Sequence, residues 1–423
     1  MVARQYRRLG TLTLACGVIL ILAGGLGRAQ APAQSGAASI RVQPSPEIAG
    51  VIAGGTQPQV IAIGLMGADD PIWLPGVGLV FTEPNANRIV QLLDGDTLTT
   101  FVGGLRAPLG MTVDREGHLI SLQSEAGFTG VRVVWPPGKE AVLAERFQGL
   151  PFSRPNGIVS DRKGGVYLSD PGLAPPQEAE LRKTQKRLPP AVYYVPRGGE
   201  PIQVADGIAR PNGVHLSRDE KTLYVNDTNG IQSFAFDVLS DGRLSNRRVF
   251  ATYAGRTPPL GATDGVASGA DDLVIDNDGR VYAITAAGIE VFTEAGKPLG
   301  IIPVTCSPTG ARCQALAFGG QDKRILYVAG NGTLLRLQMV AQGFMSENLH
   351  NRLGLRMDPP SGRGNGRTMD FSTQAVKEAL NPFGGQLAKG GYDVRPWRSA
   401  DFSPVSSRFC CSMRRLSLAS DGP

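Results

Sequence analysis

The feature that most constrains this chain is a pattern that recurs six times between residues 71 and 328. Each copy begins with a short apolar strand, continues through a turn rich in Asp, Gly or Lys, and ends in a second apolar or aromatic strand. Such a unit is typical of a β-hairpin, and the roughly 40 to 60 residues between copies leave room for two further strands in each. The copies are Pro71–Phe81, Met111–Ile120, Ile158–Leu168, Val214–Val225, Leu273–Tyr282 and Leu316–Val328.

An all-β repeat of this length predicts propeller blades, and six copies predict a six-bladed β-propeller. The 55 glycines of the 423-residue chain suit many short strands joined by tight turns. We expect the propeller to span residues 59–340. Residues 32–58 are predicted to be a linker, and residues 341–423, where the repeat stops, are predicted to be a basic tail of low order.

The N-terminus has the pattern of a secretory signal peptide. Three arginines precede an apolar run from Leu9 to Leu26, and the A-x-A-like sequence Ala29–Ala31 follows it. We therefore predict a signal peptide over residues 1–31, a mature protein that is periplasmic or secreted, and no stable membrane span after cleavage. The alternative is an uncleaved anchor, since the apolar run approaches the length of a membrane span.

The positive charge of the chain is confined to its two ends. The formal net charge is +6, of which residues 1–31 carry +4 and residues 341–423 another +4, so the part between them carries −2. A body of this charge lacks the basic surface that binds nucleic acid, and we predict no nucleic-acid partner.

Cysteine and histidine usage restricts the chemistry further. Cys306 and Cys313 flank a turn-like segment that can close a small disulfide loop. With three histidines and no CxxC pair, the chain is a poor candidate for a zinc site built from His and Cys. There is no Gly-x-Ser-x-Gly sequence, and His118 and His215 fall within predicted hairpin strands, which argues against a Ser/His/Asp triad.

Aligning the six repeats on their turns places polar residues at one equivalent position. In a propeller the first strand of each blade lines the axis, so equivalent positions lie at one height around it. Carboxylate and amide oxygens without sulfur or imidazole are what a hard divalent cation selects. We therefore predict a metal site built from Asp69, Asn156, Asn212 and Asp271. The six aligned residues are Asp69, Leu109, Asn156, Asn212, Asp271 and Gln314.

Two of these positions have a simpler interpretation. Asn156 and Asn212 are each followed by Gly and preceded by Pro, which is also an ordinary turn signal. Each residue taken singly fits a structural role, and it is their coincidence at one position of the repeat that favours a site. The segment Asp276–Gly279 resembles part of a calcium loop but lacks the remaining ligands, so we interpret it as a hairpin turn.

Over residues 60–340 the chain resembles the senescence-marker-protein/gluconolactonase/luciferin-regenerating family, the regucalcin-type group of metal-dependent lactonases. The motifs that carry the resemblance are Arg154–Gly157, Tyr167–Pro171, Arg210–Gly213, Leu223–Asp227, Leu244–Phe250 and Ser268–Asp276. By this resemblance the acidic metal ligand, usually Glu, falls on Asp69, the Asn ligand on Asn212, and the Asp that is both ligand and base on Asp271. Asn156 matches the Asn beside metal and substrate, and Arg154 the arginine that contacts substrate.

The chain departs from the family pattern in the length of one side chain and in the number of acidic residues at the site. Asp69 is one methylene shorter than the usual Glu, and Asp70 and Asp272 stand where the family has glycine. The resemblance implies one divalent cation, with Ca²⁺ favoured over Mn²⁺, Mg²⁺ or Zn²⁺.

The resulting prediction is an exported, divalent-metal-dependent lactonase that hydrolyses a sugar lactone or a similar cyclic ester. Asp271 is the predicted catalytic base, and Arg154 with Asn156 bind the substrate. Alternatives on the same scaffold are a metal- and ligand-binding propeller without turnover, a strictosidine-synthase-like enzyme and a phosphotriesterase-like enzyme.

Overall fold

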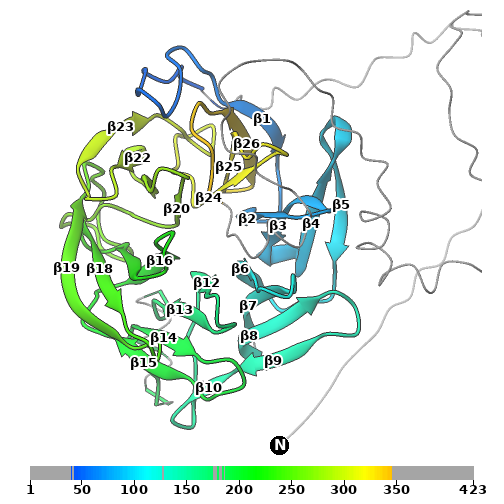
Figure 1. Cartoon of the computed structure of the whole chain (residues 1–423), viewed down its shortest axis with the longest axis vertical. Coiled ribbons are helices and arrows are strands. Elements are labelled where there is room, and N and C mark those ends of the chain that lie inside the picture. The colour runs from blue at the N-terminus through cyan, green and yellow to red at the C-terminus, as the bar shows by residue number, and fades with distance from the viewer. Residues whose placement is uncertain are drawn as a thin grey trace, which may run out of the picture. The chain divides into compact units, whose positions relative to one another are not determined.

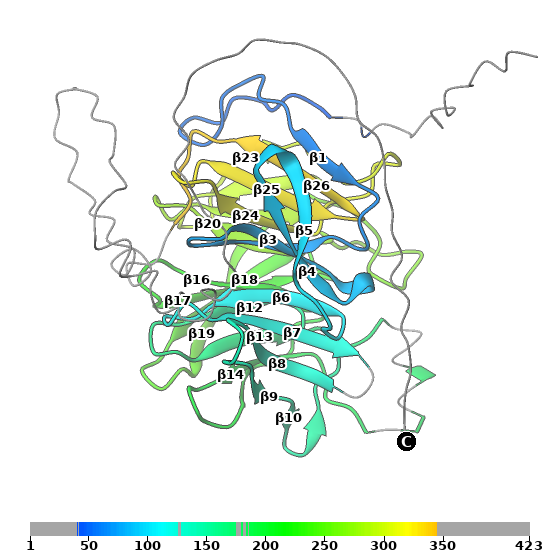
Figure 2. The same cartoon turned by 90° about the vertical axis from the view of Figure 1, so that its right-hand side faces the viewer.

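The computed structural model describes residues 40, 42–125, 128–174, 179–180, 183–184 and 186–344. Six four-stranded antiparallel sheets surround a common axis (Figure 1). Each sheet is one blade, and in all but the last blade the strands follow in chain order from the axis outward, as the side view shows for blade 2 (Figure 2). The predicted six-bladed β-propeller is confirmed, whereas the predicted signal peptide and the tail from residue 345 onward lie outside the described residues.

The first three blades come from consecutive segments. Blade 1 holds β2 (Asp69–Leu74), β3 (Gly78–Glu83), β4 (Arg88–Leu93) and β5 (Thr97–Val102), with short 3₁₀ turns η1 (Pro84–Ala86) and η2 (Asp94–Asp96). Blade 2 holds β6 (Pro108–Val113), β7 (Leu119–Glu125), β8 (Phe128–Trp135) and β9 (Ala141–Ala144). A small hairpin, β10 (Arg146–Phe147) with β11 (Leu150–Pro151), precedes blade 3, which holds β12 (Ile158–Ser160), β13 (Val166–Asp170), β14 (Ala191–Val195) and β15 (Ile202–Ala205).

The last three blades follow the same order until the ring closes. Blade 4 holds β16 (Pro211–Leu216), β17 (Thr222–Asp227), β18 (Gln232–Val238) and β19 (Leu244–Thr252). Blade 5 holds β20 (Leu273–Ile275), β21 (Val281–Thr285), β22 (Gly288–Phe292) and β23 (Pro298–Ile302). Blade 6 holds β24 (Ala315–Gly319), β25 (Ile325–Gly330) and β26 (Thr333–Gln338), and its outer strand is β1 (Gln59–Ile63) from the other end of the propeller.

The strand β1 therefore closes the ring. It runs antiparallel to β26, with Gln59 opposite Arg336 and Ile63 opposite Thr333. Because the outermost strand of blade 6 comes before blade 1 in the chain, the first and last blades cannot separate without breaking this pairing. The repeat pattern did not predict this closure.

Apolar side chains fill the spaces between neighbouring blades. The largest buried cluster lies in blades 5 and 6 and includes Tyr282, Leu316 and Leu335. Ile48, Val51 and Ile52 are buried in the same cluster, so the described part of the predicted linker 32–58 packs against the propeller instead of spacing it from the N-terminus. At the other end, Gly343 forms a β-bridge with Asp276.

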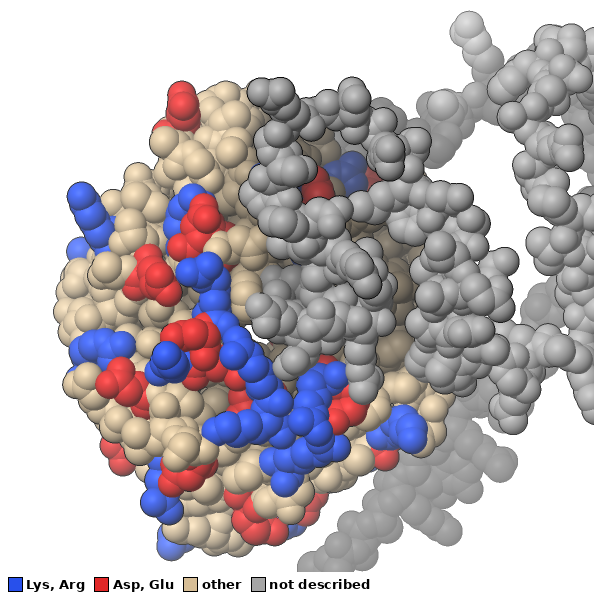
Figure 3. Space-filling model, in the orientation of Figure 1, with Lys and Arg blue, Asp and Glu red and all other residues tan. Residues whose placement is uncertain are grey.

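Charged side chains of both signs share the surface. On the face shown in Figure 3, Lys and Arg gather in an arc near the centre, interleaved with Asp and Glu. Several hairpin turns pair such charges between neighbouring blades, as in Arg162 Nε with Glu220 Oε1 at 3.3 Å. No helix among the described residues is long and apolar enough to span a membrane.

Candidate metal and substrate site

The inner strands of neighbouring blades meet at the aligned positions. Backbone hydrogen bonds join the inner strands at this height. In each bond, the amide of the residue directly after the aligned position donates to the carbonyl of the aligned residue in the next blade. Equivalent positions of the repeat are thus held side by side around the axis. These bonds are Gly110 N to Asn156 O (3.1 Å), Gly213 N to Asp271 O (3.0 Å) and Asp272 N to Gln314 O (3.1 Å).

Two of the glycines that follow the aligned residues are required by this close approach. A Cβ on Gly157 would lie 2.5 Å from the carbonyl oxygen of Asn212, and a Cβ on Gly213 would lie 2.5 Å from the carbonyl oxygen of Asp271. Neither glycine has a positive φ. The Asn-Gly pairs are therefore not tight turns, which was the simpler interpretation; each glycine lets one inner strand touch the next.

Asn212 and Asp271 form the best-ordered part of the site. The Asn212 amide nitrogen Nδ2 donates to Asp271 Oδ1 at 2.6 Å and to Thr228 Oγ1 at 3.0 Å. Thr228 uses its single hydroxyl proton to donate to the carbonyl of Ala270 at 2.7 Å, so it can only accept from Asn212. The orientation of the Asn212 amide is thereby fixed, and its Oδ1 atom points elsewhere.

The Asn212 Oδ1 atom is buried and accepts no hydrogen bond from any described residue. An unsatisfied buried acceptor of this kind costs on the order of 1–3 kcal/mol, so such atoms usually face a ligand, a water or an ion. The backbone of Asp271 is held as well, because Asn226 Nδ2 donates to its carbonyl at 2.8 Å.

The second oxygen of Asp271 is paired with an arginine. Arg312 Nη1 donates to Asp271 Oδ2 at 2.6 Å, with 11% of the Asp271 side chain and 30% of the Arg312 side chain exposed. Neither the repeat nor the family motifs predicted Arg312 as a site residue, since it lies outside the repeat, directly before Cys313. The two cysteines that bracket this segment, Cys306 and Cys313, form a disulfide, as their spacing allowed.

Asp69 lies close to this group from blade 1. Its Oδ1 accepts the Asp70 amide at 3.0 Å, while its Oδ2 accepts nothing from the described residues. Burial and, second, the negative charge of Asp271 raise the pKa of Asp69 to about 7, against the lowering effect of the Arg154 and Arg312 guanidinium groups. Asp69, Asp271 and both arginines therefore act on one another electrostatically.

Asp70 and Asp272 add two more carboxyl groups. Asp70 Oδ2 accepts the Met111 amide, and Asp272 Oδ2 accepts the Leu316 amide at 3.3 Å. Burial, followed by the charge of Asp272, raises the pKa of Asp70 well above its usual range, and burial raises the pKa of Asp272 to about 8.

A buried aspartate in blade 3 positions the backbone of Arg154, two residues before Asn156. Asp170 Oδ1 accepts the Arg154 amide at 2.9 Å, and Asp170 Oδ2 accepts the Ser153 amide at 2.6 Å. The guanidinium of Arg154 and the side-chain amide of Asn156 are both partly exposed and have no hydrogen-bond partner among the described residues. They are thus available to a substrate.

The remaining two aligned positions hold no free ligand. Leu109 is buried, and the Gln314 side chain is occupied because its Oε1 accepts the Asn331 amide at 3.0 Å. The structure brings Asn212 and Asp271 into hydrogen-bond contact, and Asp271, Arg154 and Arg312 all act electrostatically on Asp69.

These residues fit a hard divalent cation. Asn212 Oδ1 is buried without a donor, Asp69 Oδ2 is free, and Asp271 supplies a second carboxylate, so the donor set is all oxygen. Asp69, Asn212 and Asp271 would hold the ion.

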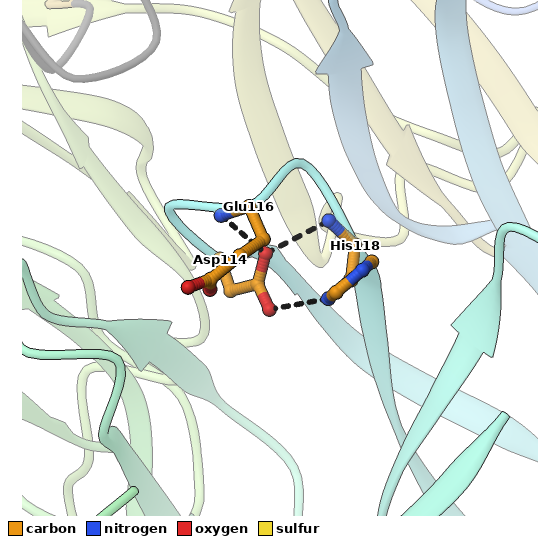
Figure 4. A group of neighbouring side chains, drawn as sticks. All are labelled: Asp114, Glu116 and His118. Atoms are coloured by element: carbon orange, nitrogen blue, oxygen red, sulfur yellow. Dashed lines mark hydrogen bonds and ion pairs between the residues drawn. The ribbon is translucent and has the colours of Figure 1, made fainter. Parts of the chain in front are cut away.

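A second acidic group lies in the hairpin turn of blade 2. One ligand atom from each of Asp114, Glu116 and His118 falls within 4.8 Å of the others (Figure 4). Asp114 Oδ1 accepts the amides of Glu116 and His118, and Oδ2 lies 2.9 Å from His118 Nδ1. The same amide pattern recurs at Asp161 and Asp276, so this is the repeated turn of the blades; at Asp276 it is the hairpin turn that the sequence predicted.

Residues 71–331, more than half of the chain, match the SMP-30/gluconolactonase/LRE-like family. The chain belongs to this family. The resemblance found in the sequence motifs is therefore confirmed, and with it the expectation that relatives are lactonases. The chain is 24% identical over 313 residues to a gluconolactonase of Zymomonas mobilis, a match that spans 70% of this chain and 84% of the relative.

Other relatives in this family match shorter segments. Lactonase drp35 of Staphylococcus saprophyticus is 35% identical over 147 residues, which cover 34% of this chain and 40% of the relative. Among solved structures, a gluconolactonase of Xanthomonas campestris superposes with a TM-score of 0.57 at 24% identity, covering 71% of this chain and 96% of the other. The calcium-binding protein regucalcin of Agrobacterium tumefaciens gives a TM-score of 0.53 at 17% identity, covering 68% and 96%. These two structures share the fold.

Proposed function

We propose that this protein is a divalent-metal-dependent lactonase that hydrolyses a sugar lactone or a similar cyclic ester. The observation that carries the proposal is the buried Asn212 Oδ1 atom, which lacks a donor among the described residues and belongs to a side chain whose Nδ2 is fixed on the carboxylate of Asp271. Two carboxylates balance the charge of one divalent cation. Ca²⁺ is the favoured ion because every available donor is oxygen.

The reaction needs a base, an oriented substrate and stabilisation of an oxyanion. When bound, the cation would supply Lewis-acid stabilisation of charge on the carbonyl oxygen. Asp271 would take a proton from the attacking water while the water oxygen bonds to the carbonyl carbon. The ring C–O bond then breaks, and the released oxygen takes up that proton from Asp271, which gives a hydroxy acid. Arg312 and Asn212 hold the Asp271 carboxylate in place, and Arg154 and Asn156 would orient the substrate.

We also propose that the protein acts outside the cytoplasm, as a periplasmic or secreted enzyme. The arginine-rich start followed by an apolar run supports this, and so does the Cys306–Cys313 disulfide, because structural disulfides persist in oxidising compartments. Fractionation of cells expressing the full chain, with N-terminal sequencing of the product, tests it. A product that keeps residues 1–31 and stays in the cytoplasm would refute it.

The test of the proposed activity is hydrolysis of a lactone panel after chelation, repeated with Ca²⁺, Mn²⁺, Mg²⁺ or Zn²⁺ restored. Asp271→Asn and Asn212→Leu are the site variants. A matched control is Asp237→Asn, because Asp237 also pairs with an arginine, Arg248, at 2.6 Å, but on the outer strands of blade 4. We expect metal-restored turnover in the wild type and the control, and at least a 100-fold loss in both site variants.

Two results would contradict the proposal. Turnover that survives chelation, or that is unaffected in both site variants, would exclude this metal site as the catalytic centre. If the protein binds the cation with Asn212-dependent affinity yet hydrolyses no lactone, it is a binding propeller. Hydrolysis of aryl phosphotriesters but not of lactones would instead indicate the phosphotriesterase alternative.

A further inference from the structure

Arg312 is the residue in this site that neither the repeat nor the family motifs indicated. Only its Nη1 group makes hydrogen bonds, to Asp271 Oδ2 at 2.6 Å and to the Cys313 carbonyl at 3.3 Å. Among the described residues its Nε and Nη2 groups have no acceptor. Arginine carries five N–H donors in a planar fork, so most of its donors remain available.

The chain holds Arg312 in place by several independent contacts. Its own carbonyl accepts Asn331 Nδ2 at 2.7 Å, and the neighbouring Cys313 is tied to the buried Cys306. Between the cysteines, Cys306 N donates to Ala311 O at 2.9 Å. A side chain carried on such a braced loop loses little conformational freedom when it binds a ligand.

The backbone opposite Arg312 leaves room for its side chain. A Cβ on Gly269 would lie 3.3 Å from Arg312 Nε and 3.4 Å from Arg312 Cδ, so any larger residue at 269 would press on the arginine. Gly269 also has a φ of 63°, which disfavours other residues. With 30% of its side chain exposed, Arg312 remains accessible to a small molecule.

The charge of Arg312 is not fully cancelled within the site. Once a divalent cation balances Asp69 and Asp271, the Arg312 guanidinium keeps a positive charge beside them, and its side chain is 30% exposed. Arg154 adds a partly exposed guanidinium that has no hydrogen-bond partner among the described residues. Asp70 and Asp272 do not cancel this positive charge by direct pairing, because they accept the amides of Met111 and Leu316.

We propose that Arg312 binds a carboxylate of the substrate, so that the preferred lactone is an anionic one that carries a free carboxylate besides the ester. This inference rests on the proposed lactonase function. A planar guanidinium with unused Nε and Nη2 groups matches a carboxylate in bidentate fashion, whereas a lactone with only hydroxyl groups offers those donors neutral acceptors, which bind more weakly. Arg312 is thus a specificity-determining residue as well as a positioning residue for Asp271.

The experiment compares two lactones that differ only at one carbon. D-Glucono-1,4-lactone ends in a hydroxymethyl group, and D-glucaro-1,4-lactone has a carboxylate in its place. We expect the wild type, loaded with its best cation, to have a kcat/KM at least 10-fold higher for the glucarolactone. Arg312→Gln lowers turnover of both lactones through Asp271 but reduces the ratio of the two kcat/KM values by a further 10- to 100-fold, with Arg312→Lys in between. Arg248→Gln, which breaks an ion pair of the same 2.6 Å length on blade 4, leaves the ratio unchanged.

A second readout separates failure of this inference from failure of the lactonase proposal. Binding of D-glucarate and D-gluconate to the Ca²⁺-loaded protein is measured by calorimetry, and glucarate is expected to bind at least 10-fold more tightly in an Arg312-dependent manner. Equal losses of kcat/KM for both lactones in Arg312→Gln, or equal binding of the two acids, would overturn the inference. If neither lactone is hydrolysed but glucarate binds selectively, the lactonase proposal fails and the anion site stands.

Discussion

Lys323 offers a test of what a buried charge costs where blade 6 meets blade 1. It lies in the turn between β24 and β25 of blade 6, with only 8% of its surface exposed. Its ammonium group donates to the Phe318 carbonyl at 3.3 Å and lies 6.0 Å from the ring centroid of Trp73, in the strand that begins with Asp69. Burial lowers the pKa of Lys323 from 10.5 to about 8.

The lowered pKa means that the charged Lys323 side chain destabilises the folded state at neutral pH. Below pH 8 both the folded and the unfolded state carry the proton, and lowering the pKa from 10.5 to about 8 corresponds to about 3 kcal/mol against folding. Between pH 8 and 10.5 the unfolded chain binds more protons, so stability rises with pH through this group. Replacing Lys323 by Met removes the charge but also a hydrogen bond worth about 1 kcal/mol, so we expect about 2 kcal/mol of stabilisation at pH 7. Near pH 9.5 the gain should fall to about zero.

The measurement is guanidinium chloride unfolding, followed by far-UV circular dichroism at pH 7, 8 and 9.5, for the wild type and Lys323→Met. Lys221→Met is the matched control, because Lys221 lies in the corresponding turn of blade 4 with 82% of its side chain exposed. The control should change the free energy of unfolding by less than about 0.5 kcal/mol at every pH. A Lys323→Met effect that is destabilising at pH 7, or that does not change with pH, would refute the reasoning.

Two further substitutions test the geometry of the site. Gly213→Ala places a Cβ 2.5 Å from the Asp271 carbonyl oxygen, so we expect the free energy of unfolding to fall by about 2 kcal/mol. We also expect weaker Ca²⁺ binding, measured by calorimetry. If neither value changes, the close approach of the two strands is contradicted. Asp114→Ala removes the acceptor of the Glu116 and His118 amides, so we expect the free energy of unfolding to fall by about 1 kcal/mol. The number of Ca²⁺ ions bound should not change. Loss of one bound ion would instead show that this turn is a metal site.

The sequence predicted the blades well because a hairpin is encoded locally. Each inner strand, its turn and the second strand lie within about a dozen residues, so apolar alternation and turn residues suffice to find them. Ring closure is different. The strand β1 is five residues long, half-exposed and paired with a strand more than 270 positions later, so nothing near Gln59–Ile63 reveals its partner. Likewise Ile48, Val51 and Ile52 form no repeat, and only the assembled blades 5 and 6 give them a surface to bury against.

For the site, alignment of the repeats found the residues that the inner strands carry. Asn212 and Asp271 meet because each follows the same backbone path in its own blade. The alignment did not find Arg312, because Arg312 belongs to a connecting loop. It did not find Thr228 either, because Thr228 orients the Asn212 amide only by donating its hydroxyl proton to the Ala270 carbonyl. The only local hint of Arg312 was its position between two cysteines, which predicts a braced loop without indicating what that loop presents.

The two extra carboxyl groups of the site have a structural explanation in the same alignment. In blades 2, 3 and 4 the residue after the aligned position is Gly110, Gly157 or Gly213, and two of these amides donate to the next inner strand. In blades 1 and 5 the corresponding residues are Asp70 and Asp272, whose side chains accept amides of the following blades. These carboxyl groups therefore join inner strands, and burial, followed by the charge of Asp272, raises the pKa of Asp70. One oxygen of Asp70 and one of Asp272 accept backbone amides of the following blade, so these two side chains are engaged within the ring. Asp69, Asn212 and Asp271 remain the donors that can face a cation.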